Sequence, residues 1–364
     1  MILAVNLMLN LKKLIVTGPS ASFFFIKFIK KISLLLFFSI IFLASGCKSN
    51  NKDSSFTGVV MGTTYEVKVA SSKEIDPDMA ELINSKLQSM NKIFTTYDES
   101  SELMIFNDSP INVPQKVSMH MLEVLIAAKD VYIKSSGSFD PTVASLVNLW
   151  GFGPILADKK IPDKQAITDL LAATGMDKLQ IDIKDKTATR LSDIKLDLSA
   201  IAKGYAADCV ARLLDDFNIE NYLIEVGGEL RVRGKKLNGK KWNIAIEKPY
   251  FVQSEAQVII QLIDSGVATS GNYRNFFKLN EKIYSHTIDP RNGYPIEHDL
   301  ISATVIADSA AIADAFSTAM MVMGPKNAIE LAKEYNLAVY LIIQNGDTFD
   351  TIFSENFKQY FIGE

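Results

Sequence analysis

The chain has 364 residues, a formal net charge of −4 and only two cysteines. This length allows a large hydrophobic core, in one big domain or two interlocked ones. The slightly acidic balance lacks the basic footprint of nucleic-acid-binding proteins, so we expect no nucleic-acid partner. Two cysteines are too few for a disulfide framework, which excludes the small disulfide-stapled folds.

The N-terminus resembles a secretory signal. The lysine-containing segment 27–31 precedes an apolar run at 32–43, and the small residues 44–46 then precede Cys47. A basic segment, an apolar run of about a dozen residues and small residues before the cut are typical of a signal peptide. A membrane-spanning helix needs roughly 20 apolar residues, so the run is short for an anchor. Signals typically run about 15–30 residues, so we expect the true start to lie after Met1.

The small residues before Cys47 resemble a lipobox, where a bacterial lipoprotein is cleaved and its new N-terminal cysteine is acylated. Ala44 stands where leucine is commoner. The resemblance implies a signal peptide at 1–46, lipidated Cys47 and a polar tether at 47–55. We therefore expect an extracytoplasmic protein anchored by lipid to a bacterial membrane, at the periplasmic face of the inner membrane or at the outer membrane. An incidental or buried cysteine is the alternative.

The periodicity of the remaining chain predicts helices and strands in an α+β arrangement. A strand-like alternation at 56–69 is interrupted by Met-Gly-Thr, and strands are predicted at 242–247 and 256–262 within a sheet-rich block. Apolar residues at helical spacing predict helices elsewhere, at 77–94, 117–135 and near 163–174. The polar segment 157–185 is expected at the surface.

A predicted strand-to-helix junction at 194–208 carries the first candidate site. The alternating residues 194–199 predict a half-buried strand, and the small residues after Ser199 predict a helix with Ser199 as its N-cap. A helix N-terminus presents free N–H groups and suits phosphate. Lys203 adds a cation, and Gly204 is predicted to leave a gap for a bulky anion. An ordinary junction with a surface lysine is the alternative.

A second candidate site lies on the helix predicted at 309–323, which ends at Gly324. Its residues are almost all small or apolar, so we expect it to be buried. Asp314 and Thr318 are four apart and share one face. A buried carboxylate is costly unless it is paired or bound to a metal. Two hard oxygens suit Mg²⁺, although Ca²⁺ also fits by ligand type. The alternative is Asp314 paired with an arginine or capping a neighbour.

Two turns complete the candidate residues. Gly-Ser-Phe-Asp-Pro-Thr-Val at 137–143 reads as a turn capped by Asp140, and Asp-Pro-Arg-Asn-Gly at 289–293 reads as another. His286 precedes the second turn on a predicted strand. With three histidines in the chain, it is not part of a histidine-rich metal cluster. The sequence has neither a Rossmann glycine fingerprint after a strand nor a P-loop.

Six separated segments resemble the ApbE family of flavin transferases, which take FAD as substrate. The closest is Asp-Leu-Ser-Ala-Ile-Ala-Lys-Gly-Tyr-Ala-Ala-Asp at 197–208. The others, in the family's order, include Met-Gly-Thr at 61–63, Thr-Thr-Tyr to Phe-Asn at 95–107, the turns at 137–143 and 286–293, and Asp-Ala-x-x-Thr-Ala at 314–319. The resemblance implies one α+β catalytic domain at 56–364. Glu229, where relatives usually carry aspartate, is a mild departure that puts a direct role for this carboxylate in doubt.

By this resemblance the protein transfers FMN from FAD to a Thr or Ser hydroxyl of an acceptor protein and releases AMP. The acceptor would belong to a membrane redox complex or be another flavinylated extracytoplasmic protein. Mg²⁺ would be held by Asp314, Thr318 and the backbone carbonyl of Ala200, with Ser317 adjacent. The positions implied at the flavin nucleotide are Met61, Tyr97, Ser138, Phe139, Asp140, Asp197, Lys203 and Ile288.

The resemblance leaves the proton acceptor and the reaction open. His286 is a candidate base for the acceptor hydroxyl, and Asp289 is its rival. Water in place of the acceptor would make the protein a metal-dependent FAD diphosphatase. A non-catalytic flavin-binding lipoprotein is a further alternative, but storage needs no reactive metal, and the pair Asp314 and Thr318 speaks against it.

Replacing Cys47 by alanine should abolish incorporation of a radiolabelled fatty acid, because the acylated thiol is lost. The matched variant Cys209→Ala, which removes the other cysteine, should keep the label. Undiminished labelling of Cys47→Ala would show that Cys47 is not the acylated residue.

Overall fold

 The computed structural model describes residues 53–154, 160–249, 255–273, 276–279 and 282–363, which belong to one compact unit. Cys47, the predicted signal peptide and most of the predicted tether lie outside the described residues. Ser54 and Ser55, assigned to the tether, already belong to the first strand. Within these ranges no helix has the length and apolar character needed to cross a membrane.

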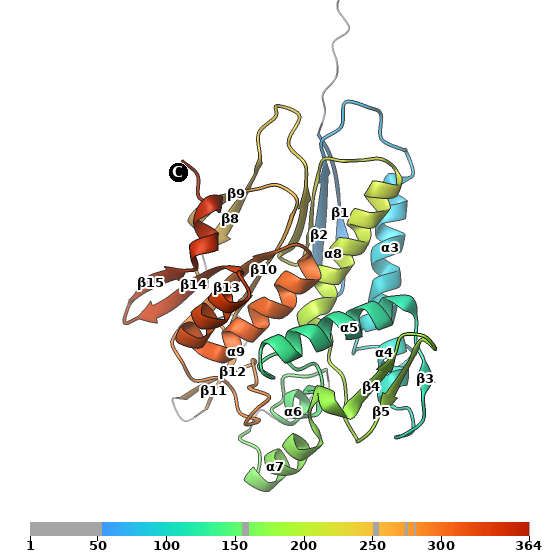
Figure 1. Ribbon diagram of the computed structural model, residues 1–364, viewed down its shortest axis with the longest axis vertical. Helices are drawn as coiled ribbons and strands as arrows, with labels where there is room; N and C mark the ends of the chain where they lie inside the picture. Colours follow the sequence, from blue (N-terminus) through green and yellow to red (C-terminus); the bar gives the residue numbers. More distant parts are fainter. Residues whose placement is uncertain (1–52, 155–159, 250–254, 274–275, 280–281, 364) are drawn as a thin grey trace, which may run out of the picture. The chain divides into compact units, whose positions relative to one another are not determined.

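The described chain is organised around an eight-stranded antiparallel sheet, in the order β1-β2-β6-β7-β10-β13-β14-β15 (Figure 1). Its strands are β1 (Ser54–Val60), β2 (Thr63–Val69), β6 (Tyr222–Val226), β7 (Glu229–Arg233), β10 (Ser265–Gly271), β13 (Leu300–Ala307), β14 (Ala338–Asn345) and β15 (Thr348–Phe353). The alternation at 56–69 thus forms the hairpin β1–β2. Met61 and Gly62 form its two-residue turn with φ of 51° and 72°, as the twist of such hairpins favours.

Helices cover one face of this sheet and a small hairpin covers the other. The helical layer contains α3 (Met79–Phe94), α5 (Met119–Lys134), α8 (Ser199–Asp216) and α9 (Ala310–Glu334), which share the largest apolar core with the sheet (Figure 1). On the opposite face, β8 (Trp242–Glu247), β9 (Ala256–Leu262) and the 3₁₀ helix η3 (Glu355–Tyr360) enclose a second core. The strands predicted at 242–247 and 256–262 are confirmed.

Shorter elements complete the layer around the ends of α5 and α8. They are α4 (Glu102–Asn107), β3 (Gln115–Lys116), α6 (Ala144–Leu149), α7 (Lys164–Ala173), η2 (Met176–Lys178), β4 (Leu179–Asp182), β5 (Thr187–Arg190), β11 (Phe276–Leu279) and β12 (Lys282–Ser285). Strands β3, β5 and β4 form a small sheet that periodicity did not predict. A third apolar cluster around Trp150 joins α6 to β11 and β12, and the Trp150 indole donates to the carbonyl of Gly293.

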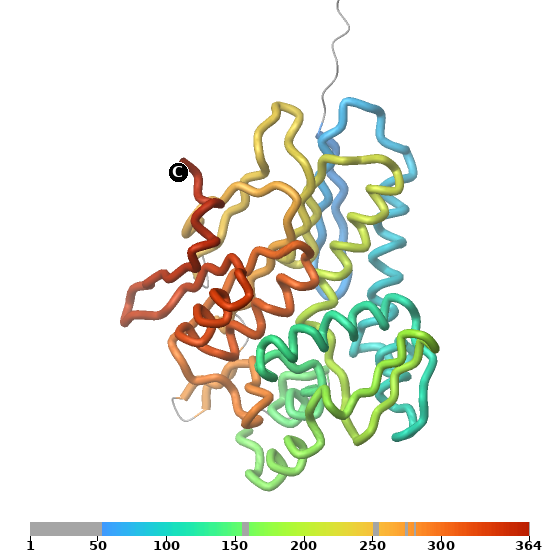
Figure 2. The backbone as a smooth tube through the Cα atoms, in the orientation of Figure 1, coloured from blue at the N-terminus to red at the C-terminus, as the bar shows by residue number. Residues whose placement is uncertain are grey.

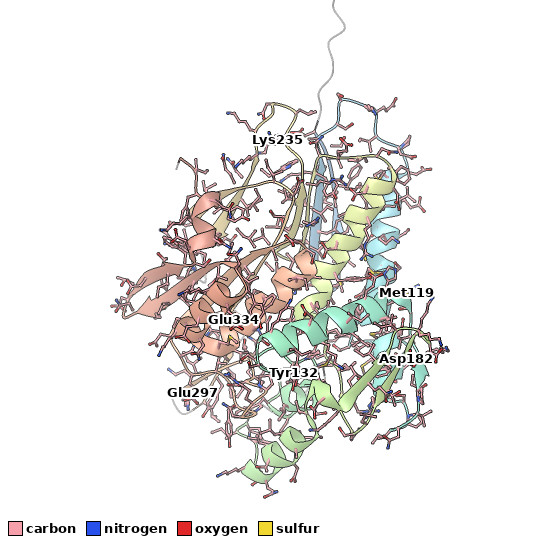
Figure 3. All side chains as sticks on the ribbon, in the orientation of Figure 1. Met119, Tyr132, Asp182, Lys235, Glu297 and Glu334 are labelled. Carbon is pink, nitrogen blue, oxygen red and sulfur yellow. The ribbon has the colours of Figure 1, made fainter. Side chains whose placement is uncertain are left out.

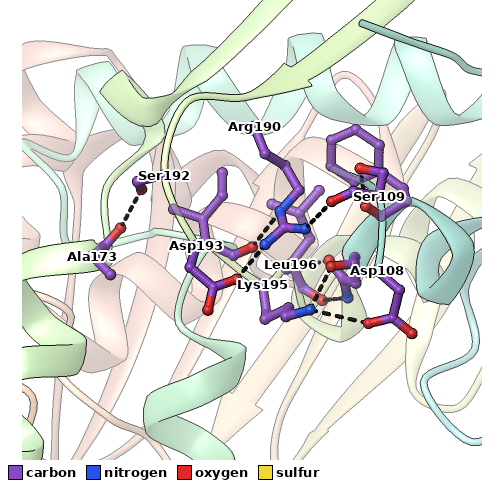
Figure 4. Close-up of polar contacts among 11 residues, drawn as sticks. Asp108, Ser109, Ala173, Arg190, Ser192, Asp193, Lys195 and Leu196 are labelled. Carbon is purple, nitrogen blue, oxygen red and sulfur yellow. Dashed lines mark hydrogen bonds and ion pairs between the residues drawn. The ribbon is translucent and has the colours of Figure 1, made fainter. Parts of the chain in front are cut away.

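The strand predicted at 194–198 is wrong: this segment is extended but makes only an isolated bridge through Lys195. Side chains hold it instead of a sheet (Figure 4). The buried Arg190 guanidinium donates to the carbonyls of Ile194 and Ser109. The Asn107 side chain donates to the Leu196 carbonyl and accepts from its N–H. These contacts fix the path of the chain into α8.

The N-cap prediction at Ser199 is also wrong, because Leu198 is the N-cap and Ser199 is the first helical residue. The side chain of Asp197 accepts a hydrogen bond from the Ser199 N–H instead. Ser309 caps the start of α9, where its side chain accepts a hydrogen bond from the Ile312 N–H. Gly324, with φ of 76°, interrupts the helix before Pro325. The predicted stop at Gly324 is thus a kink after which the helix resumes.

The sequence predicted that Gly204 would leave a gap for a ligand. The structure contradicts this prediction. Helices α8 and α9 cross side by side here (Figure 2). A Cβ on Gly204 would come within 2.3 Å of the Ala310 carbonyl oxygen and 2.8 Å of the Ala311 nitrogen. The missing side chain therefore lets two backbones meet, and the space it leaves is filled by α9.

Replacing Gly204 by alanine should destabilise the protein. Alanine gains about 1 kcal/mol in helix propensity over glycine, but overpacking against backbone costs about 1–3 kcal/mol, and more where nothing can move. Urea denaturation should therefore show a lower free energy of unfolding. Asp216→Ala, on the exposed end of the same helix, should change it by no more than about 0.5 kcal/mol. A stabilised Gly204→Ala variant would contradict the close crossing.

Candidate active site

The candidate residues meet in a cavity of about 420 Å³ at one end of the helical layer. Its walls come from the loop after α3, the turn after α5, the start of α8, β7, β10, the turn after β12, and α9. The residues named from the sequence that line it are Tyr97, Ser138, Phe139, Asp140, Asp197, Ala200, Lys203, His286, Ile288, Asp314 and Thr318. Met61, Asp289 and Ser317 are not in its lining.

Two carboxylates and one ammonium group lie together in this cavity. Lys203 Nζ is 3.1 Å from Glu229 Oε1, and it also donates to the Ser199 carbonyl at 3.3 Å. Asp314 Oδ2 accepts the Gly204 N–H at 3.1 Å, and only 2% of Asp314 is exposed. Glu229, which the sequence left in doubt, is 5% exposed and belongs to the cluster. With all three groups ionised the cluster carries one negative charge.

Burial and mutual attraction shift the pKa values in this cluster. Burial raises the pKa of Asp314, while the Lys203 ammonium and the Gly204 N–H oppose that rise. Burial likewise raises the pKa of Glu229 against the pull of Lys203. Burial alone would lower the pKa of Lys203, but Asp314 and Glu229 together raise it above its ordinary value. Lys203 therefore stays charged, and two carboxylates compete for it.

Three hydroxyl groups meet where β10 packs against the part of α9 that carries Asp314. Ser270 Oγ lies 2.7 Å from Ser317 Oγ and 3.1 Å from Thr318 Oγ1. Ser317 Oγ also donates to the Asp314 carbonyl, so this hydroxyl is fully engaged within the fold. Thr318 faces the cavity. Ser270, which the sequence analysis did not single out, lies on β10, and its hydrogen bonds hold that strand against α9.

The donors around Asp314 fit a hard cation that is completed by a ligand's own oxygens. The described residues contain no group of three or more His, Cys, Asp or Glu side chains that could enclose a metal by themselves. One carboxylate, the Thr318 hydroxyl and the Ala200 carbonyl are oxygen donors of the kind Mg²⁺ accepts. Gly204 N–H, the regular helical partner of that carbonyl, donates to Asp314. The residues present thus fit Mg²⁺ together with phosphate.

The turn after α5 forms the opposite wall. Met119 marks the first residue of α5, and Tyr132 lies near its last residue, just before the turn begins (Figure 3). Asp140 Oδ1 accepts from the N–H and the hydroxyl of Thr142, as its capping role predicted. Burial raises the pKa of Asp140 to about 6, against those hydrogen bonds. Ser138 Oγ is buried in the cavity wall without a hydrogen-bond partner in the described structure.

The two candidate bases differ in their surroundings. Both oxygens of Asp289 bind the Arg291 guanidinium at 2.8 Å, and the Asp289 backbone closes the turn at Gly293. Its carboxylate therefore organises the turn. His286 lines the cavity one residue beyond β12, with its ring near the edge of Phe152. Of these two groups, only His286 reaches the cavity.

Two residues expected at the flavin lie at the margin. Tyr97 stands at the cavity mouth with 81% of its surface exposed. Met61 is partly buried against the main core in the β1–β2 turn. Gly227 lies between the β1–β2 hairpin and the charged cluster. A Cβ on Gly227 would lie 2.6 Å from Thr63 of the hairpin and 3.3 Å from Lys203 of the cluster.

A fixed cation, a helix N-terminus and a set of hard oxygens lie in one cavity, and these are groups that suit phosphate and a divalent ion. The ApbE family model matches residues 61–341. The chain belongs to the ApbE family.

Named relatives and solved structures agree with this assignment. The FAD:protein FMN transferase of Haemophilus influenzae is 39% identical over 91% of this chain and 98% of its own. The FAD:protein FMN transferase of Escherichia coli K12 is 38% identical over 84% of this chain and 89% of its own. The apo flavinyl transferase ApbE of Pseudomonas stutzeri has a TM-score of 0.79 and 36% identity, covering 85% of this chain and 97% of its own. The flavin transferase ApbE of Vibrio cholerae has a TM-score of 0.77 and 36% identity, covering 85% of this chain and 99% of its own. The expected α+β fold is confirmed.

Replacing Asp140 by asparagine should flatten the pH dependence of stability. The folded-state pKa of about 6 exceeds the ordinary 3.8, so the folded state holds this proton more tightly than the unfolded chain. Stability is therefore lost as pH rises from 4 to 6, by about 2–3 kcal/mol. Asparagine keeps the Oδ1 acceptor for Thr142 but carries no charge. Denaturation at pH 4, 5, 6 and 7 should show wild type losing more than the variant; parallel curves would contradict a buried, titrating Asp140.

Proposed function

We propose that this chain transfers FMN from FAD to a threonine or serine hydroxyl of an acceptor protein, with Mg²⁺. The hydroxyl oxygen attacks the flavin-side phosphorus, the bond to the AMP phosphate breaks, and AMP and a proton are released. The observation that carries the proposal is the cluster of Asp314, Lys203 and Glu229 beside the start of α8. Membership of a family whose named relatives are FAD:protein FMN transferases supports it.

The chain's own residues supply the electrostatics of this step. Lys203 stays charged between its two carboxylates and offers a fixed cation to the diphosphate. The N-terminal N–H groups of α8 add positive potential that needs no reorganisation during the reaction. Asp314, Thr318 and the Ala200 carbonyl would hold Mg²⁺, which neutralises charge on phosphate oxygens when bound.

The remaining walls would orient the flavin and the attacking group. Tyr97 at the mouth offers an aromatic face for the isoalloxazine ring. Ser138, Phe139 and Asp140 line the opposite wall, and Asp197 and Ile288 complete it. His286 is the base we propose for the hydroxyl proton, since the Asp289 carboxylate is bound by Arg291.

A lipid anchor at Cys47 would hold the enzyme beside its acceptors outside the cytoplasm. The proposal rests on the signal-like order before Cys47, which lies outside the described residues. Acceptors in membrane redox complexes would then be within reach, because a tethered enzyme meets a membrane-bound partner at raised effective concentration.

The test is AMP release from FAD with and without a protein acceptor. A docked acceptor supplies its hydroxyl at high effective concentration, so a transferase should release AMP much faster with acceptor and add one FMN mass to it. A purified flavin-carrying domain of a membrane redox complex serves as the probe. Equal AMP release with and without acceptor, and no mass gain, would favour the FAD diphosphatase. Flavin binding without AMP release would indicate a storage protein.

In the same assay, Asp314→Asn should lower AMP release by about a hundredfold or more, since several kcal/mol of transition-state stabilisation depend on the metal. Asparagine retains an acceptor for the Gly204 N–H, so the fold should persist. It is a better test than Asp314→Ala, which would leave that buried N–H without its partner. Excess EDTA should reduce the wild-type rate similarly. Full activity in EDTA would contradict a metal role.

A further inference from the structure

A second cavity, of about 510 Å³, lies on the side of the sheet away from α8 and α9. We call it the β8 groove, because five consecutive residues of β8, Asn243–Glu247, line it. Its floor is formed by residues of β2, β6, β7 and β10, including Thr64 and Val267. The groove is separate from the active-site cavity and adjoins it at one end only.

Strand β8 presents its backbone edge to the groove. Successive side chains of a strand point to opposite faces, so an unbroken run of five residues lines one cavity when the strand lies along it edge-on. In the described part of the chain, β9 is the only strand that pairs with β8. The other edge therefore offers backbone donors and acceptors, which an incoming extended segment can pair with.

The groove and the active-site cavity meet where β7 and β10 separate. Their pairing ends at Leu230 and Val267. Beyond that pair, Thr269 lines both cavities, while Gly228 lines the groove and Glu229 lines the active site. A Cβ on Gly228 would find no heavy atom within 4 Å. The two cavities therefore adjoin at Thr269, with Gly228 and Glu229 on either side of the boundary.

An unpartnered polar atom marks the active-site side of the junction. Glu229 Oε1 binds Lys203, but Oε2 is buried and has no hydrogen-bond partner in the described structure. A carboxylate oxygen accepts hydrogen bonds and a buried one left alone is costly, so a ligand with a donor is favoured here. A polypeptide with a serine or threonine hydroxyl offers the missing donor.

We infer that an extended segment of the acceptor protein docks in the β8 groove as an added strand on β8. Its hydroxyl-bearing residue enters the active site between Gly228 and Thr269. This inference rests on the proposed transfer and adds no chemical step to it. It assigns the groove to the acceptor polypeptide, and the adjoining cavity to FAD.

Filling the groove should separate acceptor binding from flavin chemistry. Ala245 is exposed in the middle of β8 and lines the groove, so Ala245→Trp should obstruct the docked segment. Ala256→Trp is the matched control, an exposed alanine on β9 outside the groove lining. With the purified redox-complex domain as acceptor, Ala245→Trp should raise the acceptor KM by about tenfold or more. The KM for FAD and AMP release without acceptor should stay at wild-type values in both variants.

Hydrogen exchange provides an independent measurement that needs no turnover. An acceptor domain with its reactive hydroxyl residue changed to alanine should bind without reacting, and amides within 243–247 should then exchange more slowly. Protection confined to other surfaces would overturn the inference. An unchanged acceptor KM in Ala245→Trp would do the same.

Three outcomes separate the docking inference from the proposed function. A raised KM for FAD in Ala245→Trp would assign the groove to the AMP half of FAD and overturn acceptor docking. If the wild-type chain transfers no FMN, the proposed function fails and the docking inference fails with it. If wild type transfers FMN normally and Ala245→Trp matches it, docking alone is overturned.

Discussion

The close crossing of α8 and α9 is the constraint on which the active site depends. The first residue of α9, Ala310, is held between two glycines: a Cβ on Gly204 or on Gly266 would lie within 2.3 Å of its backbone. Asp208 of α8 accepts the N–H groups of Ala310 and Ala311. This contact fixes α9 in register with α8 and places Asp314 one turn further along, against the Gly204 N–H.

That register brings two carboxylates and one ammonium group together in a buried cluster. The unbalanced charge of this cluster favours the binding of a ligand. Two carboxylates around one ammonium leave a net negative charge in the cavity, and the buried Glu229 Oε2 has no hydrogen-bond partner in the described part of the chain. Burying charge is costly unless it is paired. Under the proposed function, a divalent cation would relieve the repulsion, and the resulting positive site would then suit a diphosphate. The same imbalance that costs stability in the free protein would therefore contribute to binding.

Several parts of this site were predictable because they depend on local pattern. The Ala-rich helix with Asp314 and Thr318 four residues apart shows in the sequence that one face is polar and buried. The turn chemistry of Asp140 follows from its place before Pro141 and Thr142. The resemblance to the ApbE family then assembled these separate segments into one expected site. The sequence pattern failed at 194–198, where alternation is real but Asn107 and Arg190, far away in sequence, replace strand pairing.

By itself the sequence determined the secondary structure of the long elements, the buried character of α9, the family and eleven of the residues that line the cavity. Periodicity and short motifs encode these because they act over a few neighbouring residues. Only the tertiary structure decided that Gly204 faces α9 and not a ligand, that Asp289 belongs to Arg291, and that Glu229 pairs with Lys203. Each of these depends on which backbone or charge arrives from another element, and no local pattern records the distance between two segments that fold together.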